Sequence, residues 1–197
     1  MTKKKIFSTA ICCLLLSAAS ANAGDARNFA MVSGYWADQS INDIETENKF
    51  APPGTDIVFN DGWGIQGRVG RWIDNTVAVE GMVEYTKFKA DNIPGLKDDF
   101  ELINAMAMAR IAFWRQPSLT PYFASGLGLM DVYEDIDLNG ATCSTRHFGV
   151  SSRLALGMDY YLMNNVSLNL EGAYTGGIGG INRVRFFSVG LGAAYHF

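Results

Sequence analysis

Alternation of apolar and polar residues is the feature that most limits how this 197-residue chain can fold. Successive side chains of a β-strand point to opposite faces, so a period of two predicts strands with one apolar face and one polar face. Residues 76–88 show the pattern most clearly. Their apolar set is Val77, Val79, Val83 and Tyr85, and their opposite set is Ala78, Glu80, Met82, Glu84 and Thr86.

Seven other segments repeat this alternation. They are residues 29–37, 62–72, 101–114, 120–130, 147–160, 166–175 and 187–197. A helix is the competing interpretation for residues 102–114, because Ala and Met favour helices. Phe113 and Trp114 favour a strand at the end of that segment.

The connections between these segments alternate in length. Long polar connections fall at 38–61, 88–100, 131–146 and 176–183, and short ones fall at 73–75, 115–119 and 162–165. Both chain ends then lie on the side of the short connections, which is the connectivity of an outer-membrane barrel. The predicted fold class is all-β, an eight-stranded antiparallel up-and-down transmembrane β-barrel that spans residues 24–197.

Composition agrees with a folded membrane barrel. Hydrophobic residues make up 48% of the chain and charged residues 18%, which excludes a disordered chain. The net charge of −4 argues against a nucleic-acid partner bound through phosphates. Beyond the first twenty-odd residues, no apolar run reaches the roughly 18 residues that a membrane helix needs.

The first 23 residues have the pattern of a secretory signal peptide. Three lysines (residues 3–5) precede the apolar stretch 6–19, and Ala21 and Ala23 offer small residues for cleavage before Gly24. Cleavage would leave 13 Lys and Arg against 20 Asp and Glu, a net charge of −7. Only Cys143 would remain of the three cysteines, so no disulfide within the mature chain is expected.

The polar faces of the predicted strands carry charges and small residues that suit a narrow lumen, whereas Val, Leu, Phe and Tyr on the other faces suit lipid. The charged set is Arg68, Glu80, Glu84, Arg110, Arg153, Asp159 and Glu171. Aromatic residues near the strand ends predict two bands at the membrane interfaces. They are Trp36, Trp63, Trp72, Trp114, Tyr160, Tyr161, Tyr195 and Phe197.

Three of these charges are expected to form a row across the lumen. A hairpin centred on Asp74 places Arg68 opposite Glu80, and Arg110 lies at a similar depth on the next strand. A carboxylate between two guanidiniums satisfies charges that would otherwise be buried without partners.

The chain ends on the aromatic Phe197 in an alternating run, which resembles the C-terminal assembly signal of bacterial outer-membrane proteins. With the signal peptide and the eight segments, residues 24–197 resemble the small opacity-type, OmpA/OmpX-like outer-membrane β-barrels. The resemblance implies export to the bacterial outer membrane, with the N-terminus facing the periplasm. It implies outer-membrane lipids, lipopolysaccharide and the barrel-assembly machinery as partners.

The first functional hypothesis is a non-catalytic surface barrel with four exposed loops and a structural or adhesion role. Acidic residues in the first and third loops would contact basic host or cell-surface proteins. They are Asp38, Asp43, Glu45, Glu47, Asp56, Asp131, Glu134, Asp135 and Asp137. The second hypothesis is a small porin-like channel, which requires an open lumen, although eight strands usually leave room only for side chains.

The third hypothesis is a lipid A-modifying enzyme. His147 and Ser151 share the polar face, and Glu171 lies on the following strand. A serine nucleophile needs the histidine within hydrogen-bond reach and an acid to orient it. In the deacylase branch of such barrels the two residues are two positions apart and face lipid, whereas here they are four apart and face the lumen. No catalytic residue is therefore assigned.

Two further motifs are weak. Residues 135–140 match the opening of an EF-hand loop, but Arg146 occupies position twelve, where calcium needs an acid. An acidic surface loop with a turn at Asn139 and Gly140 is expected instead. The glycines of residues 176–180 lack the Lys-Ser/Thr pair of a phosphate loop, so a flexible loop is expected. The sequence thus indicates no cofactor and no metal site.

Overall fold

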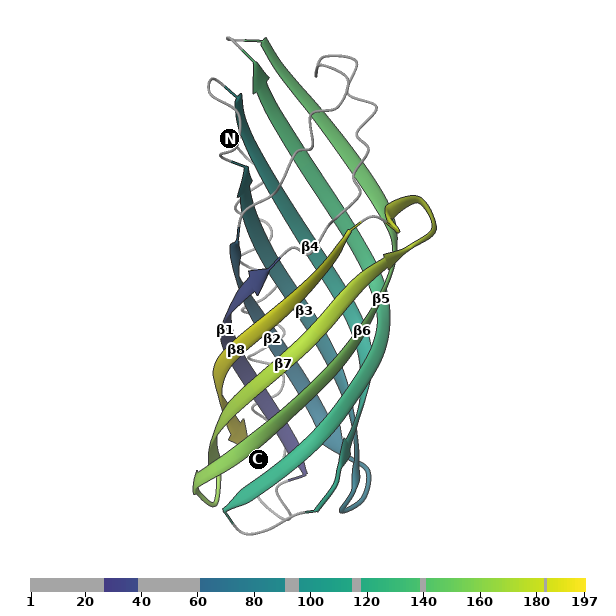
Figure 1. Cartoon of the computed structure of the whole chain (residues 1–197). Helices are drawn as coiled ribbons and strands as arrows, with labels where there is room; N and C mark the ends of the chain where they lie inside the picture. Colours follow the sequence, from purple (N-terminus) through teal and green to yellow (C-terminus); the bar gives the residue numbers. More distant parts are fainter. Residues whose placement is uncertain (1–26, 39–60, 91–95, 115–117, 139–140, 183) are drawn as a thin grey trace.

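The chain forms one closed barrel of eight antiparallel strands (Figure 1). The computed structural model describes residues 27–38, 61–90, 96–114, 118–138, 141–182 and 184–197. Each strand pairs with its neighbours in sequence, and β1 pairs with β8 to close the barrel. The strands are β1 (Asn28–Asp38), β2 (Gly62–Trp72), β3 (Val77–Ala90), β4 (Leu96–Ala112), β5 (Leu119–Leu138), β6 (Ala141–Met163), β7 (Val166–Ile178) and β8 (Arg185–His196). The predicted fold class is confirmed.

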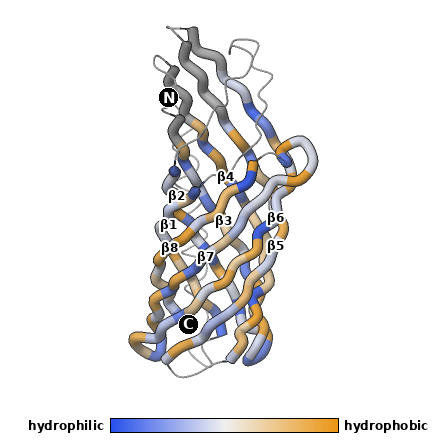
Figure 2. The backbone as a smooth tube through the Cα atoms, viewed as in Figure 1, coloured by the Kyte–Doolittle hydropathy of each residue, from blue (hydrophilic) through white to orange (hydrophobic). Residues whose placement is uncertain are grey.

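The alternation in the sequence becomes an alternation of burial. Along β1 and along β7, nearly every second residue is buried in the lumen. Most of the intervening residues of each strand are exposed on the outside. Figure 2 shows the corresponding change of hydropathy along each strand. The helix interpretation of 102–114 is wrong, since β4 covers this segment up to Ala112. The described part of the chain contains no helix long and apolar enough to cross a membrane.

The strands differ greatly in length. β1, β2, β7 and β8 have 11 to 13 residues, whereas β5 has 20 and β6 has 23. A tilted strand needs about 9–11 residues to cross a membrane. Figure 1 shows the extra length at one end, where β3–β6 rise above the connection of β7 to β8. We call this end the loop end, and we call the opposite end, which holds the C-terminus and the short turns, the turn end.

Two predicted loops are wrong because strands continue through most of them. The segment 131–146 forms the end of β5 and the start of β6, and only residues 139–140 lie outside the strands and outside the described residues. The segment 88–100 likewise contains the end of β3 and the start of β4. Alternate positions of these segments are charged in the sequence, such as Asp131, Asp135 and Asp137, so the apolar signal of a strand disappears while the backbone pairing continues. Residues 135–138 are therefore strand, not the beginning of a calcium loop.

Candidate functional site

The lumen contains all seven charged residues that the sequence places on the polar faces. Each is at most 4% exposed. They come from five strands, β2, β3, β4, β6 and β7, so they meet across the inside of the barrel rather than along one strand. We call Arg68, Glu80, Glu84, Arg110, Arg153, Asp159 and Glu171 the charged network.

Glu171 on β7 is the centre of this network. Arg68 on β2 donates through Nη1 to Glu171 Oε2 at 2.6 Å and through Nη2 to Oε1. Arg153 donates through Nη2 to Glu171 Oε1 at 3.1 Å, and the Tyr122 hydroxyl donates to Oε2 at 2.8 Å. A buried carboxylate that accepts hydrogen bonds from three side chains is well satisfied. If Glu171 is removed, all three side chains lose the partner that they share.

Glu80 lies between two guanidiniums, as predicted. Arg110 contacts it through Nε, and Arg68 Nη1 is 3.7 Å from Glu80 Oε2. Arg110 also donates to Asp159 Oδ2 at 2.8 Å, and its guanidinium carbon lies 3.9 Å from the centre of the Tyr122 ring. The predicted row therefore exists, but it is part of a larger network.

The strand register behind that row differs from the prediction by two residues. Arg68 is directly opposite Met82 and not opposite Glu80, which faces Gly70. The cause is the β2–β3 turn. The Asp74 carboxylate accepts hydrogen bonds from the backbone N–H of Thr76 and of Val77, which centres the hairpin beyond Asp74. These two N–H groups lower the pKa of Asp74. A shift of two residues leaves every side chain on its predicted face.

A second branch of the network lies around Glu84. Arg153 donates to Glu84 Oε2 at 2.9 Å, and Asn104 donates to Oε1 at 2.9 Å. Ser151 in turn donates to Asn104 Oδ1 at 2.7 Å. These bonds connect strands β3, β4 and β6 across the lumen. Hydrogen-bonded polar groups consequently cross the middle of the barrel, beside a buried cluster that includes Met82, Met106 and Met108.

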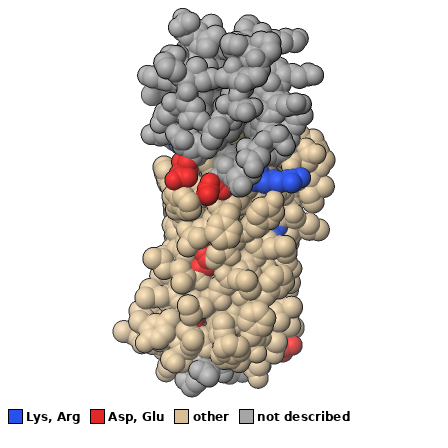
Figure 3. All heavy atoms as spheres, in the orientation of Figure 1, with Lys and Arg blue, Asp and Glu red and all other residues tan. Residues whose placement is uncertain are grey.

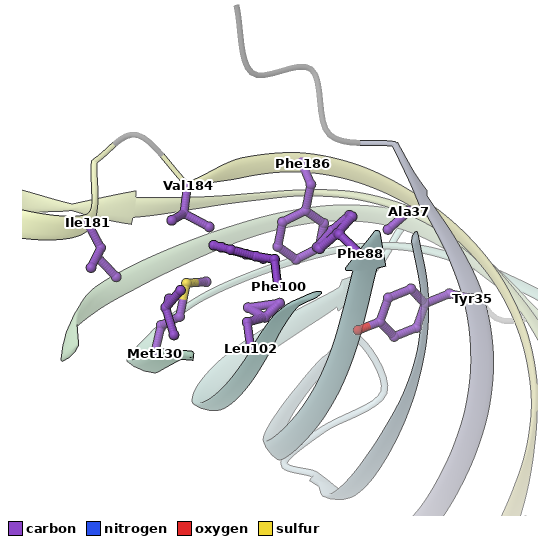
Figure 4. Close-up of a cluster of buried hydrophobic side chains, with 10 residues drawn as sticks. Tyr35, Ala37, Phe88, Phe100, Leu102, Met130, Ile181, Val184 and Phe186 are labelled. Atoms are coloured by element: carbon purple, nitrogen blue, oxygen red, sulfur yellow. The ribbon is translucent and has the colours of Figure 1, made fainter. Parts of the chain in front are cut away.

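Apolar side chains close the lumen at both ends, a feature that the alternating pattern alone does not predict. At the turn end, Phe29, Trp72, Ala78 and Ala112 pack together. At the loop end, ten residues from five strands and the β7–β8 connection form the loop-end apolar layer (Figure 4). They are Tyr35, Ala37, Phe88, Phe100, Leu102, Met130, Val132, Ile181, Val184 and Phe186.

Two predicted interface aromatics belong to the inside instead. Trp72 is 1% exposed and packs on Phe29, with the ring centres 6.3 Å apart. Tyr161 contacts the ring of His196 at 5.0 Å. Closeness to a strand end does not determine which face of the sheet a residue occupies, whereas the two-residue period does. Trp72 lies four positions after Arg68 and therefore points to the same face, into the lumen. Trp36, Trp63 and Trp114 are exposed, as expected.

The residues considered for catalysis do not meet. Ser151 is fully buried and bonded to Asn104, whereas His147 is exposed on the part of β6 that extends at the loop end. Glu171 is bonded to Arg68, Arg153 and Tyr122. A different pair, Ser167 and His196, lies 2.9 Å apart at the turn end, but the serine is fully buried, so a substrate cannot reach it. Among the described residues, no cluster of His, Cys, Asp and Glu could hold a metal ion.

The outer surface of the barrel is a belt of apolar side chains, bordered at the loop end by polar residues. Exposed side chains such as Leu127, Leu156 and Leu191 are 60–68% exposed on the outside. Figure 3 shows a mostly uncharged face, with its largest charged groups at the upper border and a few smaller ones below. A cross-strand polar row marks this border on the long strands: Lys87, Glu101, Tyr133 and Arg146 lie opposite one another in turn on β3, β4, β5 and β6.

The residues of this polar row form ion pairs and one aromatic contact, as expected at a membrane interface. Lys87 Nζ is 3.1 Å from Glu101 Oε1, and Arg146 donates to Asp131 Oδ1 at 2.8 Å. The Arg146 guanidinium also lies 4.9 Å from the centre of the Tyr133 ring. An apolar outer belt around a filled polar lumen is the inverse of a soluble barrel, and it defines an integral membrane β-barrel.

Comparison with known proteins identifies the family. The profile of the outer membrane protein beta-barrel domain matches residues 9–197, so the chain belongs to that family of bacterial outer-membrane barrels. No curated protein matches the sequence.

Solved structures share the fold. Neisserial surface protein A (NspA) has 20% identity and a TM-score of 0.58, covering 88% of this chain and 98% of its own. The attachment invasion locus protein Ail of Yersinia pestis has 15% identity and a TM-score of 0.58, covering 87% and 99%. The outer membrane protein OprG of Pseudomonas aeruginosa has 14% identity and a TM-score of 0.58, covering 87% and 96%. At these identities the likeness concerns the fold.

Proposed function

We propose that this protein is a non-conducting surface barrel whose long β3–β6 sheet projects from the cell and binds extended segments of other proteins. The orientation follows from the predicted export signal and from the short turns, which lie on the periplasmic side in this architecture. The loop end then faces outward, beyond the polar row of Lys87, Glu101, Tyr133 and Arg146.

One free strand edge carries this proposal. β6 pairs with β7 only from Val150 onward, so within the described chain residues 141–149 are paired on one side alone, by β5. Nine residues make an edge about 30 Å long. Unpaired N–H and C=O groups along such an edge are a template for another strand. Thr145, Arg146 and His147 beside it are exposed.

A channel is the second candidate, and the lumen argues against it. The charged network fills the middle of the barrel, and apolar layers close both ends. In planar bilayers the purified protein should show no steady conductance above the baseline. A steady open level would overturn the non-conducting part of the proposal.

Two experiments test the surface role. An epitope inserted between Asn139 and Gly140 should bind antibody on intact cells, whereas the same epitope between Asp74 and Asn75 should bind only after the outer membrane is opened. The reverse pattern would overturn the orientation.

The second experiment shortens the free edge from residues 141–149 to residues 146–149. Replacing residues 134–145 by Asn-Gly joins Tyr133 to Arg146 through a tight turn and keeps the register of the remaining hairpin. Cells that carry this variant should lose adhesion to immobilised matrix proteins, while a Lys87→Ala variant should keep it. Equal adhesion of the shortened and the parental protein would contradict strand addition at β6.

A further inference from the structure

Five methionines of the described chain lie inside the lumen. Met31, Met82, Met106, Met108 and Met130 are each at most 5% exposed. Three of them, Met82 on β3 with Met106 and Met108 on β4, pack in one buried cluster. Methionine fills irregular gaps well, and its thioether sulfur is also a soft metal ligand. The cluster therefore places three soft donor atoms beside the charged network.

Glu80 completes a group of four with these methionines. In the pairing of β3 with β4, Met82 lies opposite Met106 and Glu80 lies opposite Met108. All four residues are at most 5% exposed and point into the lumen. Residues directly opposite each other in an antiparallel pair are about 4.5–5.5 Å apart, and alternate residues of one strand about 7 Å, so long side chains can reach a common point. We call Glu80, Met82, Met106 and Met108 the methionine–glutamate quartet.

Glycines on β5 leave room for the two methionines of β4. A Cβ atom on Gly128 would lie 2.6 Å from Met106 Cγ, and one on Gly126 would lie 2.5 Å from Met108 Cγ. Each methionine is paired with the glycine that it covers. Both side chains therefore lean in the same direction, toward β5, and lie side by side in the space that the glycines leave.

The charged network beside the quartet carries an excess negative charge. Its members are three arginines and four carboxylates, so their formal charges sum to −1. An unbalanced charge is unfavourable in a buried site, because the surroundings replace water poorly. The lumen therefore favours one additional positive charge.

Glu80 is the member of this network whose carboxylate has spare acceptor capacity. Both carboxylate oxygens of Glu84, of Asp159 and of Glu171 accept hydrogen bonds from side chains. Glu80 forms ion pairs with two arginines, but neither of its oxygens accepts a hydrogen bond from a described residue. The excess charge and the three thioethers thus meet at the quartet.

We propose that the methionine–glutamate quartet binds one Cu(I) ion. The sulfur atoms of Met82, Met106 and Met108 are its ligands, and thioethers select Cu(I) over Mg²⁺ and Ca²⁺, which take oxygen ligands. The single positive charge of the ion balances the excess negative charge at Glu80. The ion enters while the barrel folds, because the apolar layers close the finished lumen at both ends.

Refolding in the presence of Ag(I) tests the site. Ag(I) has the charge and the sulfur preference of Cu(I) and is stable in air. Cys12, Cys13 and Cys143 are replaced by alanine, so that no thiol competes for the ion. The protein is purified from outer membranes, unfolded in urea and refolded in detergent with silver nitrate in a chloride-free buffer. Free ions are removed on a chelating resin, and the silver held per folded chain is measured by inductively coupled plasma mass spectrometry.

The quartet predicts about one silver ion per folded chain. Replacing Met106 and Met108 together by leucine should lower this value at least about tenfold, because two of three sulfur ligands are lost while apolar volume is conserved. Replacing Met31 and Met130 together by leucine is the matched control and should leave it unchanged, since both are inward methionines outside the quartet. Glu80→Gln should lower it less, because it removes the excess charge and keeps the sulfurs.

Two further measurements separate an internal Cu(I) site from surface binding. Silver added after refolding should load much more slowly than silver present during refolding. Cu(I), kept reduced by ascorbate and present during refolding, should replace the silver. Folding of each variant is checked by the mobility shift between unboiled and boiled samples, and Met82→Leu carries the test if the double variant does not fold.

Several outcomes would overturn the site. They are a parental protein that holds no silver after refolding, equal silver in the parental protein and the quartet variants, and equal loss in the Met31 and Met130 control. Equally fast loading of the folded barrel would place the ion outside the lumen, and failure of Cu(I) to replace silver would exclude Cu(I) as the ligand.

Discussion

The middle of the lumen and its loop end are both buried, but charged pairs cross the middle beside a cluster of methionines, whereas the loop end is filled by apolar side chains. In the middle, Arg68, Arg153 and Glu171 satisfy one another across the barrel. At the loop end, Phe88 contacts Phe100 and Phe186 with ring centres 5.9 and 5.7 Å apart. Charge pairs need specific partners at short distance, whereas apolar groups need only volume and shape. The two regions should therefore respond differently to the same kind of substitution.

The largest effect is expected in the middle, at Glu171. Replacing it with alanine leaves Arg68 and Arg153 short of a partner, and removing one member of a buried ion pair costs roughly 3–5 kcal/mol. Urea unfolding in detergent, followed by gel mobility, measures the change. Glu171→Gln should also be strongly destabilised, because shape without charge does not replace the carboxylate. Glu101→Ala, on the outer face, is the control and should change stability by less than about 1 kcal/mol.

At the loop end, Phe186→Ala should lower the free energy of unfolding by about 3 kcal/mol through loss of packing. Phe186→Leu should restore most of the stability, since it conserves apolar volume, with a remaining loss below about 1.5 kcal/mol. The same unfolding assay applies. A conservative variant as unstable as the alanine variant would remove the distinction between the two regions.

A double-mutant cycle on Glu80 separates its two arginines. Glu80→Ala should destabilise the barrel by about 2 kcal/mol, less than Glu171→Ala, because Glu171 accepts hydrogen bonds from Arg68, Arg153 and Tyr122, whereas Glu80 contacts two arginines that each keep another carboxylate. The coupling energy with Arg110→Ala should exceed that with Arg68→Ala, since Arg68 is 3.7 Å away. Strict additivity for Arg110 would contradict the described ion pair.

A matched pair of glycines in β2 compares the inner and outer faces of one strand. A Cβ on Gly64 would lie 2.6 Å from a ring carbon of Tyr35, whereas one on Gly67 would meet nothing within 4 Å. Gly64→Ala should therefore cost about 1–2 kcal/mol through overpacking. Gly67→Ala should be neutral or slightly stabilising, because alanine loses less backbone freedom. Equal effects would contradict this assignment of faces.

The smallest effect is expected at the β2–β3 turn. The N–H groups of Thr76 and Val77 lower the pKa of Asp74, so its ionised form stabilises the folded state. This contribution is present above the ordinary aspartate pKa of 3.8 and is lost as the pH falls through the lowered value. The stability difference between parental protein and Asp74→Ala should thus be present at pH 7 and shrink toward pH 2. A difference independent of pH would exclude this origin.

The sequence predicts the barrel and its faces well because both depend on a two-residue period. β2 has the predicted bounds, and Arg68, Glu80 and Glu171 all face inward. Strand ends at the loop end were missed because alternate positions of 131–137 are Asp or Tyr in the sequence, so the apolar signal is absent although the backbone of β5 stays paired.

The partners inside the lumen were harder to predict. Arg68 bonds chiefly to Glu171, 103 residues away and on a strand that is not its neighbour, so no local rule connects them. The β2–β3 register depended on a side-chain hydrogen bond of Asp74 that only the folded turn reveals. The apolar layers are built from inward residues such as Phe100 and Phe186, whose neighbours become known only once the sheet is closed.

The 103-residue separation of Arg68 and Glu171 has a consequence for how the barrel assembles. β2 and β7 face each other only after the sheet has rolled up, so in a half-formed array of hairpins Arg68 and Glu171 would lack each other and keep only their neighbouring-strand partners Glu80 and Arg153. Entering hydrocarbon in that state is unfavourable. Membrane crossing and barrel closure should therefore occur together, as one cooperative event, and the ion pair that fills the finished lumen also penalises every partly inserted intermediate.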